Sequence, residues 1–183
     1  MAYFTKKMLS EISTQKIFYS DKRISKATEA ISDNATFDIF LSHSYRDKDY
    51  IINLKKHIEG NFQLTCYVDW ISEPTLNRSD INPNTAKTLR KRMQQSRSFL
   101  YCTSENSPNS KWMPWELGFF DAYKGKVAIL PLVDEAEDPF DGQEYLSLYP
   151  YVDSNMLIGA NKSSSVSFKN WLGRDDNWTI RIK

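Results

Sequence analysis

Apolar runs and amphipathic stretches alternate along the middle of the chain. The runs have the length and the β-branched and aromatic content of strands that are buried on both faces. They occupy residues 37–41, 65–70, 98–102, 127–133 and, with a less regular pattern, 149–158. The stretches between them repeat their apolar residues at the spacing of one helix face. Strands and helices in alternation predict a parallel sheet that is covered by helices.

Amphipathic helices are expected between the first four runs. Their apolar faces are formed by Ile51, Leu54, Ile58 and Phe62 in the first and by Ala86, Leu89 and Met93 in the second. A long polar loop at residues 71–85 precedes the second helix, and the third helix spans about residues 112–123. Ser44 and Asp47 have the spacing of a capping box at the start of the first helix, and Gly125 is placed to end the third.

Right-handed crossovers leave few topologies for such a chain. The simplest is a flavodoxin-like, three-layer α/β fold with a five-stranded parallel sheet in the order 2-1-3-4-5 and helices on both faces. In this order the chain reverses direction between the first and third strands, and ligands bind beyond the carboxyl ends of the strands at such a point. The loops after residues 41 and 102 are therefore expected to form the site.

The regions that flank this pattern divide the chain into three parts. Residues 1–35 are expected to be a helical N-terminal extension, which either packs on the domain or serves as an assembly surface. Thr5 and Asp21 are placed as N-caps in it, and its helical apolar positions are Met8, Ile12, Ile24, Ala27 and Ile31. The main domain is expected at residues 36–160, and residues 161–183 are expected to pack on it as a C-terminal helix and tail.

Composition excludes several classes of protein. The 183 residues are 40% hydrophobic and 14% aromatic, which is enough for one ordinary core and argues against global disorder. The 24 basic and 23 acidic side chains leave a net charge of +1, so the charge excess of a general nucleic-acid binder is absent. No apolar run approaches the roughly 20 residues of a membrane span, and charges interrupt the N-terminus where a signal peptide would need an apolar core. A cytoplasmic protein with no nucleic-acid or membrane partner is expected.

The segment after the third strand carries the main chemical candidate. Pro114 is tolerated only in the first turn of a helix, so Glu116 lies near the helix start, where the dipole favours its ionised form. Trp112 is four residues earlier on the same face. A carboxylate beside an aromatic plane at the mouth of the crevice suits a cationic or oxocarbenium-like species. Spacing alone also allows a structural interpretation, in which Glu116 is an ordinary first-turn glutamate and the nearby aromatic residues are core.

Four segments together resemble bacterial Toll/interleukin-1 receptor (TIR) domains. They are FDIFLSHS at residues 37–44, YVDW at 67–70, SFLYCTS at 98–104 and SKWMPWELG at 110–118. They occur in the order of the family, which has a flavodoxin-like fold, and the resemblance covers about residues 36–135. It implies an enzyme of bacterial antiviral immunity that cleaves the nicotinamide–ribose bond of NAD and gives ADP-ribose or a cyclic isomer. The catalytic glutamate of the family occupies the position of Glu116, with the family's tryptophan at Trp112.

One carboxylate is enough for this reaction. The nicotinamide of NAD is a pyridinium cation that leaves as a neutral molecule, so the general acid of a glycosidase is not needed. An ionised Glu116 would orient the ribose and stabilise the oxocarbenium charge. NAD would then be the substrate, and neither a cofactor nor a metal is expected. Consistent with this, Cys66 and Cys102 have no metal-ligand spacing with either histidine.

Three more residues are candidate contacts of the substrate. Ser42 and His43 follow the first strand, and the resemblance implies that their loop touches NAD; a turn that merely ends the strand is the alternative. Trp70 either stacks on a ring of the nucleotide or packs in the core. Five basic residues lie on the second helix and directly after it: Lys87, Arg90, Lys91, Arg92 and Arg97. They either form the solvent-exposed face of this helix or bind a phosphate or an acidic partner.

The resemblance also implies partners. TIR domains associate with one another, and the loop at residues 71–85 would take part in such contacts. A nucleotide product would be a diffusible signal for a separate effector protein. The alternative function is a non-enzymatic adaptor that acts through TIR–TIR contacts. A phospho-receiver domain of the same fold is excluded, because the acidic cluster that would hold its metal ion is missing after the first strand.

Overall fold

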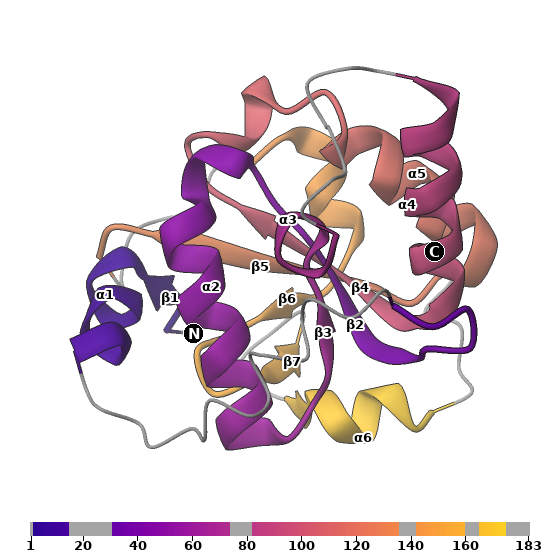
Figure 1. Cartoon of the computed structure of the whole chain (residues 1–183). Helices are drawn as coiled ribbons and strands as arrows, with labels where there is room; N and C mark the ends of the chain where they lie inside the picture. The colour runs from indigo at the N-terminus through magenta and orange to yellow at the C-terminus, as the bar shows by residue number, and fades with distance from the viewer. Residues whose placement is uncertain (1, 15–30, 74–81, 136–141, 160–164, 175–183) are drawn as a thin grey trace.

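A mostly parallel sheet with helices on both faces organises the protein (Figure 1). The computed structural model describes residues 2–14, 31–73, 82–135, 142–159 and 165–174. The strands are β1 (Phe4–Thr5), β2 (Phe37–Ser42), β3 (Cys66–Tyr67), β4 (Ser96–Thr103), β5 (Val127–Val133), β6 (Tyr151–Val152), β7 (Leu157–Gly159) and β8 (Val166–Ser167). Seven of them follow the order β3-β2-β4-β5-β6-β7-β8, and β1 lies off this path and pairs with β5. The segment β3-β2-β4-β5-β6 is parallel, which confirms the predicted order 2-1-3-4-5.

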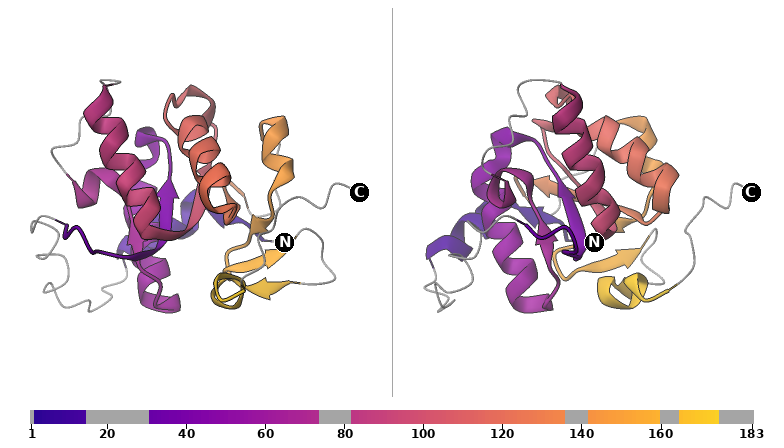
Figure 2. Two further views of the ribbon diagram at one scale, coloured as in Figure 1. Left: turned by 90° about the vertical axis from the view of Figure 1, so that its right-hand side faces the viewer. Right: turned by 45° about the vertical axis from the view of Figure 1, so that its right-hand side comes forward.

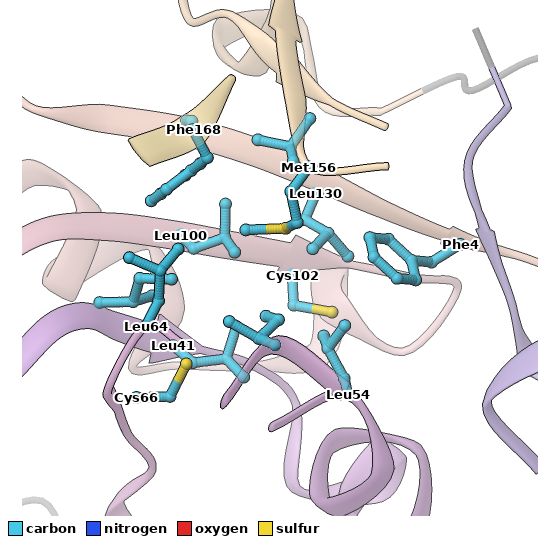
Figure 3. Close-up of a cluster of buried hydrophobic side chains, with 14 of the residues drawn as sticks. Phe4, Leu41, Leu54, Leu64, Cys66, Leu100, Cys102, Leu130, Met156 and Phe168 are labelled. Carbon is cyan, nitrogen blue, oxygen red and sulfur yellow. The ribbon is translucent and has the colours of Figure 1, made fainter. Parts of the chain in front are cut away.

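The helices lie in two layers. They are α1 (Lys6–Thr14), α2 (Lys48–His57), α3 (Asp69–Ser72), α4 (Pro83–Gln95), α5 (Met113–Lys124) and α6 (Phe168–Leu172). Helices α1 and α2 pack together on one side of the sheet, and α4 and α5 lie side by side on the other (Figures 1 and 2). Each layer covers its own core. The core beneath α2 includes Leu54, Leu100 and Phe168 (Figure 3), and the core beneath α4 and α5 includes Phe99, Leu89 and Phe120.

The predicted polar loop at residues 71–85 is shorter than expected at both ends. Residues 71 and 72 belong to α3, and α4 already begins at Pro83. The Asn82 side chain accepts a hydrogen bond from the Thr85 backbone N–H at 2.9 Å, so Asn82 caps a helix whose first residue is a proline. The middle of the loop, residues 74–81, lies outside the described residues.

The fifth predicted strand, at residues 149–158, is two strands. β6 and β7 pair antiparallel, and β8 extends the sheet by a further antiparallel pairing. Asp153 causes the reversal, because its carboxylate accepts from the backbone N–H groups of Asn155 at 3.0 Å and Leu157 at 2.9 Å. Such a side chain replaces the backbone partners of a turn. Met156 completes it with a φ of 53°.

The first residues of the chain enter the sheet. β1 pairs in parallel with the end of β5, and the Thr5 hydroxyl accepts from the Met8 N–H at 3.0 Å, which confirms Thr5 as an N-cap of α1. Lys6 then forms ion pairs with Glu105 and Asp134, which follow β4 and β5. Asp21 and the helical pattern at residues 24–27 lie outside the described residues. The division into an extension, a main domain and a C-terminal tail stays a prediction.

Two glycines, one within α5 and one directly after it, should respond in opposite directions to alanine. Gly125 ends the helix with a φ of 63°, and its N–H donates to the carbonyl groups of Asp121 and Phe120. Gly125→Ala should lower the free energy of unfolding by about 1 kcal/mol, because a Cβ disfavours the left-handed conformation. Gly118 lies within the helix with no heavy atom within 4 Å of a Cβ, so Gly118→Ala should raise it by about 0.5–1 kcal/mol. Urea unfolding measures both, and equal signs would contradict this account.

Candidate functional site

The candidate site lies where β2 and β4 end and α5 begins. Pro114 is in the first turn of α5, and the Glu116 backbone N–H donates to the Trp112 carbonyl oxygen at 2.8 Å, so the first turn closes around the glutamate. The Ser42 hydroxyl, at the end of β2, donates to Glu116 Oε2 at 2.6 Å. Two predicted site residues that are far apart in the sequence therefore meet at the point where the sheet order reverses.

His43 and Trp70 form a second pair beside the first. The Trp70 indole N–H donates to His43 Nε2 at 3.0 Å. Because an indole N–H can only donate, Nε2 accepts, which leaves His43 Nδ1 to donate to the Leu41 carbonyl at 3.0 Å. Asp69 Oδ1 lies 3.8 Å from Nε2. Both ring nitrogens of His43 are engaged within the protein, so in this tautomer the residue orients Trp70 rather than acting as a base.

The glutamate is enclosed in this conformation. Glu116 has 0% of its surface exposed, and Ser42 and His43 each have 1%. Trp112 is 8% exposed and packs edge-to-face with Trp115 at 5.3 Å between ring centroids. A dinucleotide can therefore reach the carboxylate only if covering side chains move. The four predicted positions Ser42, His43, Trp112 and Glu116 are all buried, whereas Trp70 is partly exposed.

Tyr101 is a residue of this region that the sequence did not single out. It lies on β4, fully buried, in the core beneath α4 and α5. Burial raises the pKa of its phenol above the ordinary value, and the nearby Glu116 carboxylate adds to this effect. The signal in the sequence is its alternation with Phe99, which points to the same face of the strand as Tyr101. Tyr101 therefore stays protonated beside the glutamate.

Asp47 ties the two loops of the site together. Its buried carboxylate accepts from the Ser104 hydroxyl at 2.6 Å and from the Asn106 amide at 2.7 Å. The predicted capping box is wrong, because Ser44 makes no side-chain cap and Asp47 is used across the crevice instead. The hydroxyl and amide donors of the next loop satisfy a carboxylate that is 2% exposed. The loop after β2 is thereby fixed to the loop after β4.

Arg92 anchors the base of the loop that precedes α4. Its guanidinium donates from Nε to Glu73 Oε1 at 2.9 Å, and the Tyr67 hydroxyl donates to Glu73 Oε2 at 2.9 Å. The predicted placement of Arg92 on the solvent-exposed face of the helix is wrong, since its side chain is only 7% exposed. Arg92 is thus one of the buried residues of α4, like the apolar Leu89 and Met93, and its charged end is paired with Glu73.

Clusters of metal-ligating side chains and membrane-length apolar helices are both missing from the described residues. No group of three histidine, cysteine or acidic side chains within the described ranges could hold a metal ion. Cys66 and Cys102 are free and buried, and burial raises the pKa of both thiols. In the part of the chain that the structure describes, no helix has the length and apolar character to span a bilayer.

Comparisons with known proteins agree on one family. The family model described as TIR domain matches residues 39–163. A "Probable 3' cyclic ADP-D-ribose synthase ThsB'" from Bacillus cereus (strain MSX-D12) is 46% identical over 149 residues, which cover 76% of this chain and 77% of that protein. A "Putative cyclic ADP-D-ribose synthase TIR2" from Cytobacillus dafuensis is 30% identical over 108 residues, which cover 58% of this chain and 28% of that protein.

Among solved structures, the TIR domain of the Toll-related receptor TRR-2 from Hydra magnipapillata is similar with a TM-score of 0.47 and 16% sequence identity. The match covers 65% of this chain and 85% of the receptor domain.

Proposed function

The chain belongs to the TIR domain family, and from this membership we propose that it cleaves the nicotinamide–ribose bond of NAD. The observation that carries the proposal is the position of the Glu116 carboxylate. It lies in the first turn of α5, at the point where the order of the strands reverses, and it accepts a hydrogen bond from the Ser42 hydroxyl. The similarity to two proteins named as cyclic ADP-D-ribose synthases supports a cyclic product over linear ADP-ribose. Ser42, His43, Trp70 and Trp112 would contact the substrate.

The reaction needs one charged group at the ribose. The C1′–N bond breaks, and its electron pair neutralises the pyridinium nitrogen as nicotinamide leaves. The positive charge that remains on C1′ and the ring oxygen is stabilised by the Glu116 carboxylate. A hydroxyl group of the same ADP-ribose then attacks C1′ and loses its proton, which closes the ring. Water in its place gives linear ADP-ribose, so cyclisation requires that the site exclude water again once NAD is bound.

Access to the glutamate is part of the proposal. Because Glu116 is fully buried in the single chain, an opening step precedes substrate binding. Contacts between TIR domains would supply it, and the segment between α3 and α4 would take part, since it begins at Glu73 directly after the helix that carries Trp70. In a cell, the product would be a nucleotide signal of antiviral immunity that a separate effector protein detects.

Incubation of the purified protein with NAD tests the function. Chromatographic separation should show nicotinamide together with a cyclic isomer of ADP-ribose, and the rate per molecule should rise with protein concentration, because association opens the site. Linear ADP-ribose alone would identify a glycohydrolase. Intact NAD at every concentration, with a folded protein that still self-associates, would contradict the enzymatic proposal and favour the adaptor function.

A further inference from the structure

One aromatic side chain stands out at the edge of the site. Tyr45 is 59% exposed, although Ser42, His43, Ser44 and Asp47 around it in the sequence are all buried. It begins the short turn Tyr45–Asp47 between β2 and α2. A large ring that is left in solvent directly after a buried strand end is not used for packing. Its position at the carboxyl end of the sheet, where ligands bind in this fold, calls for a different role.

Tyr45 and Trp70 form a right-angled corner. Their ring centroids are 6.4 Å apart and the ring planes are inclined by 85°. The Trp70 ring is held in place, because its indole N–H donates a hydrogen bond to His43 Nε2. Lys48, which is exposed at the start of α2, places its Nζ 5.6 Å from the centroid of the Tyr45 ring. The corner therefore combines two aromatic rings with a positive charge.

The corner is joined to the glutamate by consecutive residues. Ser42 contacts Glu116, and His43, the next residue, contacts Trp70. Trp70 packs against the core beneath α2, whereas Glu116 lies in α5 on the other side of the sheet, so a ligand whose ribose lies at Glu116 would cross the end of β2 to reach Tyr45. The corner is also accessible while Glu116 is enclosed, so it can hold one end of a ligand before the other end is admitted.

Aromatic faces bind planar bases by stacking, and a lysine ammonium binds phosphate as a point charge. NAD carries a base at each end, but its nicotinamide ribose is the reacting group and must lie at Glu116. We propose that Tyr45, together with Trp70 and Lys48, forms the subsite for the adenine ring and the adjoining phosphate of NAD. The identity of the ligand rests on the function proposed above.

The test compares two tyrosines of similar exposure. Tyr45→Ala should raise KM for NAD about tenfold, as expected for the loss of one stacking contact, and should leave kcat unchanged. Tyr45→Phe keeps the ring and should behave as wild type. Tyr123→Ala is the matched control, because Tyr123 is 52% exposed but lies at the far end of α5 from Glu116. Nicotinamide mononucleotide, which lacks the adenosine half, should be cleaved equally by wild type and Tyr45→Ala.

Binding of etheno-AMP separates this inference from the proposed function. Stacking should quench its fluorescence in wild type, Tyr45→Phe and Tyr123→Ala, and Tyr45→Ala should bind it about tenfold more weakly, even if no variant cleaves NAD. Equal binding and equal KM in wild type and Tyr45→Ala would overturn the subsite. Weaker self-association of Tyr45→Ala without a change in KM or binding would also overturn it and would place Tyr45 in the contact between TIR domains.

Discussion

Replacing Glu116 by glutamine should lower NAD cleavage by about 10²–10³-fold, the usual cost of removing one group that stabilises transition-state charge. The amide has nearly the shape of the carboxylate, and its oxygen can still accept from Ser42. It carries no negative charge to oppose the cation on the ribose. The loss should therefore fall on kcat, measured by nicotinamide release at a protein concentration where wild type is active.

The fold should survive this change. A carboxylate with no exposed surface is costly to keep charged, so the neutral amide should leave the melting temperature equal or higher. Ser42→Ala is the companion variant, because it keeps the charge of Glu116 and removes the hydroxyl that donates to it and that would contact the substrate. It should lose less activity than Glu116→Gln. A Glu116→Gln protein that cleaves NAD within a few-fold of wild type would show that the catalytic group lies elsewhere.

The central sheet could be predicted because its strands are buried on both faces. In β4 and β5 almost every side chain is buried, so the sequence shows continuous apolar runs instead of alternation. Gly125 and Pro114 mark the two ends of α5 for reasons that are local to the backbone. Right-handed crossovers determine the order of the strands. Ser42 and Glu116 both lie at the point where this order reverses, so their contact could be expected from it.

The remaining features depend on partners that are distant in the sequence. A helical pattern places Arg92 on the solvent-exposed face of α4, and only the position of Glu73 shows that its charge turns inward. The Asp47 contacts with Ser104 and Asn106 likewise cross from one loop to another. The antiparallel β6–β7 pair arises from a single turn residue, Asp153, within residues 149–158, where the sequence pattern predicts one strand. Spacing along the chain contains none of these distances.

The burial of Glu116 also depends on residues that are distant in the sequence, and it bears directly on how a substrate could reach the site. The sequence places the glutamate at a helix start, a position that is often open to solvent, but its exposure depends on the side chains that cover it. With Ser42 and His43 also buried, the glutamate that we propose as the catalytic group has no exposed surface in the single chain. If the proposed function holds, a closed site in the single chain would keep NAD intact until the proposed opening step occurs.

Arg92→Ala should lower the free energy of unfolding by about 3 kcal/mol, because removing one partner of a buried ion pair leaves the other charge uncompensated. The side chains of Arg92 and Glu73 are 7% and 17% exposed. The variant also loses the guanidinium bond to Gln95 at 2.8 Å, whereas Glu73 keeps the Tyr67 hydroxyl as a donor. Urea unfolding should show a lower midpoint with an unchanged slope.

The chain supplies a matched control in Arg97, which pairs with Asp38 at 2.9 Å but has 54% of its side chain exposed. Arg97→Ala should cost no more than about 1 kcal/mol, because water replaces an exposed partner. Adding Glu73→Ala to Arg92→Ala should restore part of the lost stability, since the orphaned carboxylate is then removed as well. If Arg92→Ala costs no more than Arg97→Ala, the Glu73–Arg92 pair does not anchor the end of α3, and the position of Trp70 depends instead on its bond to His43 and on its packing against the core.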